Sequence, residues 1–206
     1  MEDEMEFGRR EVSAGRKALL EIKDILIGVA FPLILMLVIS STVLAYASYT
    51  DDLAVSLIAL IGGEIMIAAS LVLFGRANGS AAYNKTLLNA QKRELGSTDE
   101  TVICRTGEYA LWKAAVIGLI LCLPFIIFQT IELCADNSVC RFCLQYMCGW
   151  AYFPFSYLGT SYQALNFIMI ILPVGAHMLG YHLGKLKRLK AKEYEETHAP
   201  KKRRGK

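Results

Sequence analysis

Four stretches of apolar residues, separated by polar and charged segments, set the organisation of the chain. They run from 25 to 47, from 53 to 74, from 114 to 133 and from 164 to 183. Each has about the 20 apolar residues that a helix needs to cross the hydrocarbon core of a bilayer. The pattern predicts an all-α polytopic membrane protein built as a four-helix transmembrane bundle.

The segments between these stretches differ in length, and their lengths predict how the helices connect. Residues 48–52 join the first two stretches, and a connection this short makes the two helices antiparallel neighbours. The leader 1–24, the loop 75–113 and the tail 185–206 then share one side of the membrane, and the loop 134–163 lies on the other.

Capping signals subdivide the long loop 75–113. Gly96 is a natural C-terminal stop, so we expect the second helix either to continue past its membrane span or to restart along the membrane surface, and in both cases to end near this residue. Ser97 is followed three residues later by Glu100, which predicts a capping box at the start of a short helix.

Positive charge is concentrated on one side of the predicted bundle. Of the 22 Lys and Arg residues, five precede the first span, six lie between the second and third, and ten follow the fourth, which leaves Arg141 by itself on the opposite side. Lys and Arg near span ends stay on the cytoplasmic side. Both termini are therefore predicted to be cytoplasmic, in an integral protein of the plasma membrane.

Composition supports a membrane protein and gives no sign of an enzyme. Hydrophobic residues make up 54% of the chain, against about 45–50% in an ordinary soluble domain. No nucleotide-binding, catalytic or metal-binding pattern is present, so no cofactor or metal is expected. The basic tail is predicted to attract anionic lipid rather than nucleic acid, because juxtamembrane Lys and Arg favour anionic headgroups.

The segment on the non-cytoplasmic side contains four of the six cysteines: Cys134, Cys140, Cys143 and Cys148. Disulfides persist on that side of the membrane. We therefore expect two structural disulfides in this segment. Four cysteines allow three connectivities, and the sequence does not choose between them.

A redox function is the alternative interpretation of the same segment. Cys140 and Cys143 form a Cys-x-x-Cys pair, which in a membrane bundle would suit a thiol–disulfide oxidoreductase. In topology the chain resembles the vitamin K epoxide reductase and disulfide-bond-formation families, and that resemblance implies a quinone as the cofactor. The chain departs from both families because its first outer loop, 48–52, contains no cysteine.

An aromatic cluster from Trp150 to Tyr157 follows the cysteines. Aromatic side chains of this kind commonly anchor a chain at the boundary between membrane and water. We expect the cluster to lie at that boundary, with a re-entrant or surface-lying segment as the alternative.

Four polar side chains fall inside the predicted spans: Glu64, His177, Gln129 and Asn166. At 1.5 Å per residue, Glu64 lies at mid-membrane and His177 about 5 Å lower, so the two could meet, although we favour a structural role for His177 facing the inner interface. Gln129 and Asn166 differ in depth by roughly 3 Å. A carboxylate at the bilayer centre costs above ~2.5 kcal/mol, so Glu64 is the leading functional candidate, with a purely structural hydrogen bond as its alternative.

Together these features predict a non-enzymatic module for transport or for assembly of a membrane complex, with Glu64 as its central polar group. Because four spans rarely enclose a complete pathway, a homo-oligomer or a subunit of a larger complex is implied. The alternatives are the oxidoreductase, which uses Cys140 and Cys143, and a membrane scaffold with a disulfide-tied outer loop.

Overall fold

The computed structural model describes residues 14–44, 46, 52–156 and 160–198, and the regular structure in this part of the chain is entirely helical. Three helical segments are long and apolar enough to cross a membrane: Ala14–Val43, Leu53–Glu94 and Gln163–Glu195. A bent pair of helices, Leu111–Leu121 and Leu123–Ala135, makes a fourth if the pair is counted as one span. The protein is thus an all-helical protein with three to four candidate membrane-spanning segments.

The first segment consists of α1, Ala14–Ile39, continued by the π-helical turn η1, Ser40–Leu44. The helix begins well before the predicted span at 25, so the second half of the leader is helical. Pro32 lies inside α1 and is buried. The first half of the leader, residues 1–13, the last residue of the predicted first span, 47, and residues 48–51 of the first connection lie outside the described residues.

The second segment is a single helix of 42 residues, α3, Leu53–Glu94. Asp52 caps its start, accepting hydrogen bonds from the Ala54 and Val55 amides at 2.9 and 3.3 Å. At its other end Gly96 has a φ of +73°, the left-handed conformation that terminates helices. The predicted extension of the second helix to about Gly96 is confirmed.

The short helix α4, Glu100–Ile103, is capped by a different residue from the one predicted. Asp99 is the N-cap, and its Oδ1 accepts a hydrogen bond from the Thr101 amide at 3.0 Å. Hydrogen bonds from Thr101 lower the pKa of Asp99. The predicted capping box of Ser97 with Glu100 is wrong, because an aspartate closer to the helix provides the cap.

The third segment is broken into α5, Leu111–Leu121, and α6, Leu123–Ala135, which are bent by 45°. Pro124 lies in the first turn of α6. Its ring nitrogen has no hydrogen to donate, so the helix ladder is interrupted there. The thiol of Cys122, at the break, donates instead to the Gly118 carbonyl at 3.2 Å.

The segment predicted as an outer loop contains two short helices, α7, Ser138–Met147, and α8, Gly149–Ser156. Asp136 ends α6 with a φ of +44°, and Asn137 then caps α7 by accepting from the Val139 and Cys140 amides at 2.9 and 3.2 Å. The chain therefore reverses direction immediately after α6.

Three aromatic residues of α8 are buried in the hydrophobic core. Trp150, Tyr152 and Phe153 belong to the same apolar cluster as Met36 of α1, and the Trp150 ring lies 5.5 Å from that of Phe125. These three rings therefore pack inside the bundle instead of facing lipid, and Tyr157 of the predicted cluster lies outside the described residues.

The last segment begins as a 3-10 helix, η2, Thr160–Ile170, and continues as α9, Ile171–His198. Pro173 lies in the first turn of α9, where the amide hydrogen that it lacks would have no helical partner. About two thirds of the predicted basic tail, residues 185–198, is thus a continuation of the fourth segment, and residues 199–206 lie outside the described residues.

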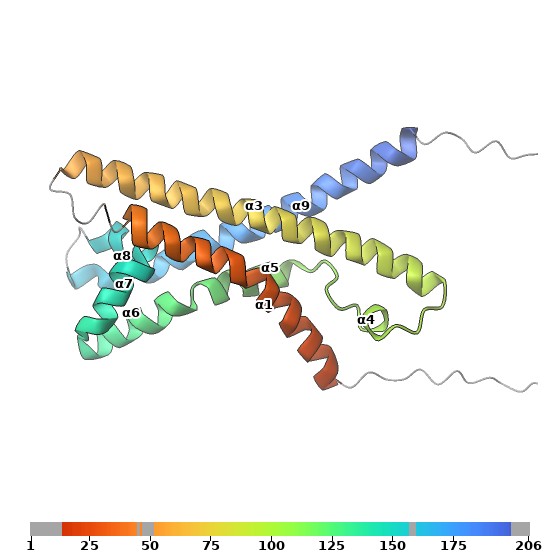
Figure 1. Ribbon diagram of the computed structural model, residues 1–206, viewed down its shortest axis with the longest axis horizontal. Coiled ribbons are helices and arrows are strands. Elements are labelled where there is room, and N and C mark those ends of the chain that lie inside the picture. Colours follow the sequence, from red (N-terminus) through yellow and green to blue (C-terminus); the bar gives the residue numbers. More distant parts are fainter. Residues whose placement is uncertain (1–13, 45, 47–51, 157–159, 199–206) are drawn as a thin grey trace, which may run out of the picture.

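The closest packing joins α3 and α9, which run parallel and cross near the middle of the molecule (Figure 1). Each helix has two glycines four residues apart, Gly75 and Gly79 in α3, Gly180 and Gly184 in α9. A Cβ added at Gly79 would strike the Tyr181 backbone, and one at Gly180 would strike the Val72 carbonyl. Glycine is required at these sites because the two backbones touch.

The two ends of the bundle differ in chemistry. The start of α1, the end of α9 and α4 lie at one end, which we call the basic end, and α7 and α8 lie at the other, which we call the cysteine end (Figure 1).

Candidate functional site

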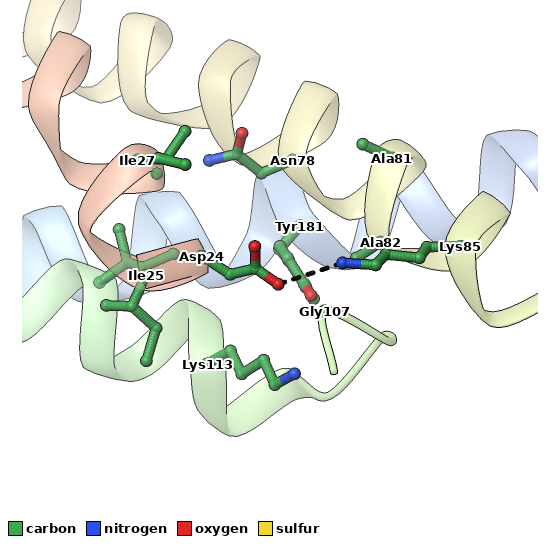
Figure 2. Close-up of a pocket in the computed structure, with 12 residues that line it drawn as sticks. Asp24, Ile25, Ile27, Asn78, Ala81, Ala82, Lys85, Gly107, Lys113 and Tyr181 are labelled. Atoms are coloured by element: carbon green, nitrogen blue, oxygen red, sulfur yellow. Dashed lines mark hydrogen bonds and ion pairs between the residues drawn. The ribbon is translucent and has the colours of Figure 1, made fainter. Parts of the chain in front are cut away.

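A cavity of about 210 Å³ lies towards the basic end, where α1, α3, α5 and α9 come together (Figure 2). Polar side chains line part of its wall: Asp24, Asn78, Lys85, Lys113 and Tyr181. The remaining lining is apolar or small: Ile25, Ile27, Gly28, Ala81, Ala82, Gly107 and Ile117. The cavity thus joins residues from all four candidate spans.

An ion pair crosses the cavity from α1 to α3. The Lys85 Nζ lies 3.3 Å from Asp24 Oδ2 (Figure 2). Gly107, from the loop before α5, approaches this pair with a φ of +71°, and a Cβ there would collide with both charged groups. Only glycine satisfies both the backbone conformation and the space, so the loop passes in direct contact with the ion pair, whose side chains are still 38% and 36% exposed.

A second ion pair is more deeply buried. Lys113, at the start of α5, is only 7% exposed, and its Nζ lies 2.6 Å from Glu21 Oε2 of α1. The same ammonium group donates to the Glu108 carbonyl at 3.1 Å. A buried ammonium needs such partners, because its desolvation is otherwise very costly.

The loop before α5 is held against α3 by hydrogen bonds. The Glu108 carboxylate accepts from Arg93 at 2.6 Å and from the Asn89 side chain at 3.2 Å. The Tyr109 amide donates to Thr86 Oγ1 at 2.8 Å. These contacts fix the position of Gly107 and Lys113 at the cavity.

Aromatic contacts connect the same loop to α9. The Tyr109 ring stacks on that of Tyr181, with centroids 4.9 Å apart, and Lys185 Nζ lies 5.0 Å from the Tyr109 centroid. Burial raises the pKa of Tyr109, so its phenol stays neutral at physiological pH. Tyr181 is therefore fixed where it lines the cavity.

From Tyr181 a stripe of buried polar side chains follows α9 and η2 into the bundle. His177 precedes Tyr181 by one helical turn, Asn166 lies about three turns further, and all three side chains are buried. Neither ring nitrogen of His177 has a hydrogen-bond partner among the described residues. We call Tyr181, His177 and Asn166 the polar stripe.

The far end of the polar stripe is joined to the third span. Asn166 Nδ2 donates to Gln129 Oε1 at 3.3 Å, in the buried interior. The two residues therefore lie at the same level, as the depth count from the sequence expects. Within the described chain, Gln129 Nε2 and Asn166 Oδ1 have no hydrogen-bond partner.

Glu64 does not meet His177, so the predicted pairing is wrong. In the register of α3 against α9, the His177 carbonyl lies against Gly75. Gly75 is eleven residues beyond Glu64, which is about 16 Å along a helix. The Glu64 carboxylate oxygens are themselves buried, and neither has a hydrogen-bond partner in the part of the chain that the structure describes.

Arg141, the isolated cation of the cysteine end, neutralises a buried acid. Its Nε donates to Glu132 Oε1 at 2.7 Å, and it also pairs with Asp136. Glu132 is almost fully buried. Interaction with Glu132 raises the pKa of Arg141.

The structure does not support the predicted disulfides. All six cysteines are free. Cys140 and Cys143 occupy one face of α7, where residues three apart have Cβ atoms about 5–6 Å apart, beyond the roughly 3.5–4.5 Å of a disulfide. Cys134 is exposed on α6, whereas Cys148 is buried in the core.

The thiol at the start of α8 is also poorly suited to redox chemistry. Burial is the main cause that raises the pKa of Cys148 to about 12, with smaller contributions from Cys143 and Cys122. A reactive thiol needs a pKa below its ordinary value, because the thiolate is the nucleophile. The Cys148 thiol therefore stays protonated and packs in the core, whereas the oxidoreductase alternative uses Cys140 and Cys143 of α7.

The cavity residues were not among the predicted site residues. A signal for them was present in the sequence, since Glu21, Asp24, Lys85 and Lys113 all lie near the cytoplasmic ends of predicted spans. Their pairing depends on contacts between segments far apart in the chain. In the described residues no group of three His, Cys, Asp or Glu side chains is placed to hold a metal ion.

Comparisons of this chain with protein-family models, with curated proteins and with solved structures gave no match.

Proposed function

We propose that this protein is a non-enzymatic transport module of the plasma membrane, with four spans, cytoplasmic termini and the cavity as its cytoplasmic binding site. The observation that supports the proposal is the cavity itself, about 210 Å³ with a carboxylate and two ammonium groups on its wall. Charges of both signs on one wall suit a small zwitterionic solute that competes for the partners of the exposed Asp24–Lys85 ion pair.

The proposed route from the cavity follows the polar stripe past His177 to Asn166 and Gln129. Unpaired polar groups are costly inside a bilayer, and those retained there commonly mark solute or ion pathways. We assign Glu64 to the same membrane-embedded polar set, although it lies apart from the stripe. Because four spans enclose little space, we propose that the module works as a homo-oligomer or within a larger complex.

Thiol accessibility tests this proposal without knowledge of the solute. Cysteine is introduced singly as Asn78→Cys in the cavity, as His177→Cys in the stripe and as Leu119→Cys on an exposed face of α5. In reconstituted full-length protein, a small water-soluble cationic thiosulfonate should react fastest at position 78, more slowly at 177 and at least about tenfold more slowly at 119, because thiolates form only where water reaches. Labelling of the native cysteines is measured on the wild-type protein and subtracted from that of each variant.

Leu119 is a matched control for depth, because its neighbour Gly118 contacts Val174, three residues from His177. If the cysteine at 177 reacts as slowly as that at 119, no water-accessible route follows the stripe. The scaffold alternative, in which the ion pairs only hold the loop to the bundle, would then be preferred.

A further inference from the structure

A second depression, of about 520 Å³, lies between α3 and α9. Three of its lining residues are cations, Arg76 from α3 with Lys187 and Arg188 from α9. The others are Leu73, Ala77, Ser80, Ala81 and Asn84, and none of the lining residues is acidic. We call this depression the basic groove.

Close helix packing assembles the basic groove. Gly184 lies against the Arg76 carbonyl and the Ser80 amide, and Ser80 Oγ donates to the Gly184 carbonyl at 3.1 Å. Lys187 and Arg188 follow Gly184 by about one turn, so they come beside Arg76 although more than a hundred residues separate them in the chain. Cations of the tail on other faces of α9 do not line the groove.

Among the described residues, no ion pair involves Arg76, Lys187 or Arg188, so the three cations of the basic groove have no acidic partner there. The two ion pairs near the cavity, by contrast, balance Lys85 and Lys113. The groove thus presents three positive charges to an anion.

The groove also lies where an apolar surface becomes polar. Leu73 is 63% exposed and belongs to the apolar span of α3. Arg76 follows three residues later, about 4.5 Å further along the helix. Beyond it, the Asn84 side chain supplies hydrogen-bond donors to the groove. A ligand that fills the groove therefore meets apolar surface at one end and cations at the other.

We infer that the basic groove binds the phosphate-bearing headgroup of an anionic phospholipid, with an acyl chain along Leu73. Basic pockets between helices on the cytoplasmic side of a membrane are suited to such headgroups. The inference does not depend on the transport proposal, because the groove and the cavity share only Ala81 in their linings.

Native mass spectrometry of the full-length protein in detergent tests the inference with phosphatidylglycerol and phosphatidylcholine as probes. We expect one tightly retained phosphatidylglycerol per chain. The variant Arg76→Gln/Lys187→Gln/Arg188→Gln should bind phosphatidylglycerol about 100-fold more weakly. Each of the three basic residues contributes roughly 1 kcal/mol to binding of an anionic lipid. The variant Arg76→Lys/Arg188→Lys retains the charge and should keep binding within about threefold of wild type.

A control variant removes three exposed cations of the basic end that do not line the groove, Lys17→Gln/Lys23→Gln/Lys190→Gln. The affinity of this control variant for phosphatidylglycerol should fall by less than about threefold, because exposed charges away from a binding site are screened by salt. Equal losses in the two triple variants would overturn the inference in favour of diffuse surface attraction. Equal retention of phosphatidylcholine, or full competition by soluble glycerol phosphate at the concentration of the lipid, would also overturn it.

Discussion

Replacing Gly79 with leucine is expected to lower the free energy of unfolding by about 3 kcal/mol or more, among the largest effects of any single change in this chain. At this position a Cβ would collide with the backbone of Tyr181, which no change of rotamer relieves. The α3 and α9 helices would have to separate. The basic groove and the cavity would be disturbed together, because both are bounded by these two helices.

Thermal unfolding in detergent, followed by tryptophan fluorescence, measures this effect. A loss of 3 kcal/mol corresponds to a fall in Tm of about 10 °C for a chain of this size. Gly175→Leu is the matched control, since a Cβ at Gly175 meets nothing within 4 Å. Equal Tm values for the two variants would show that α3 and α9 do not touch at these glycines.

Replacing Glu21 with leucine is expected to lower the free energy of unfolding by about 3–5 kcal/mol, because it leaves the Lys113 ammonium buried without an anion. The pair is 2.6 Å apart, and the side chains are 9% and 16% exposed. The double variant Glu21→Leu/Lys113→Leu should regain most of the loss, since it removes the unpaired charge. The free energy of unfolding of each single and double variant gives the coupling energy.

The more exposed pair of the cavity provides the control for this cycle. Asp24→Asn should cost only about 1 kcal/mol or less, because both partners of the Lys85 pair remain open to solvent. If Glu21→Leu lowered the free energy of unfolding no more than Asp24→Asn does, the burial of Lys113 would be contradicted.

The end of the second helix could be predicted from the local sequence, whereas the choice between two nearby capping residues, Ser97 and Asp99, could not. Gly96 ends the second helix as predicted, because a residue in the left-handed conformation terminates a helix whatever the helix packs against. The depth of Gln129 and Asn166 follows from counting residues along apolar spans, and the two side chains are hydrogen-bonded.

Features that depend on contacts between distant segments were missed. Counting from the centre of each span placed Glu64 near His177, but the glycines of α3 and α9 set a register in which they are far apart. The ion pairs of the cavity join α1 to α3 and α5, and no periodicity along the chain indicates those partners. The cysteines were assigned from their compartment, whereas their positions on helices decide whether they can pair.

The membrane side of Cys134, which is exposed on α6 towards the cysteine end, decides the proposed orientation. In that orientation Cys134 lies outside the cell and the charged cavity lies in the cytoplasm. A membrane-impermeant maleimide should therefore label the wild-type protein on intact cells, and the Cys134→Ser variant should lose that labelling. Labelling of Cys134 only after the cells are permeabilised would reverse the orientation and contradict the proposed cytoplasmic binding site.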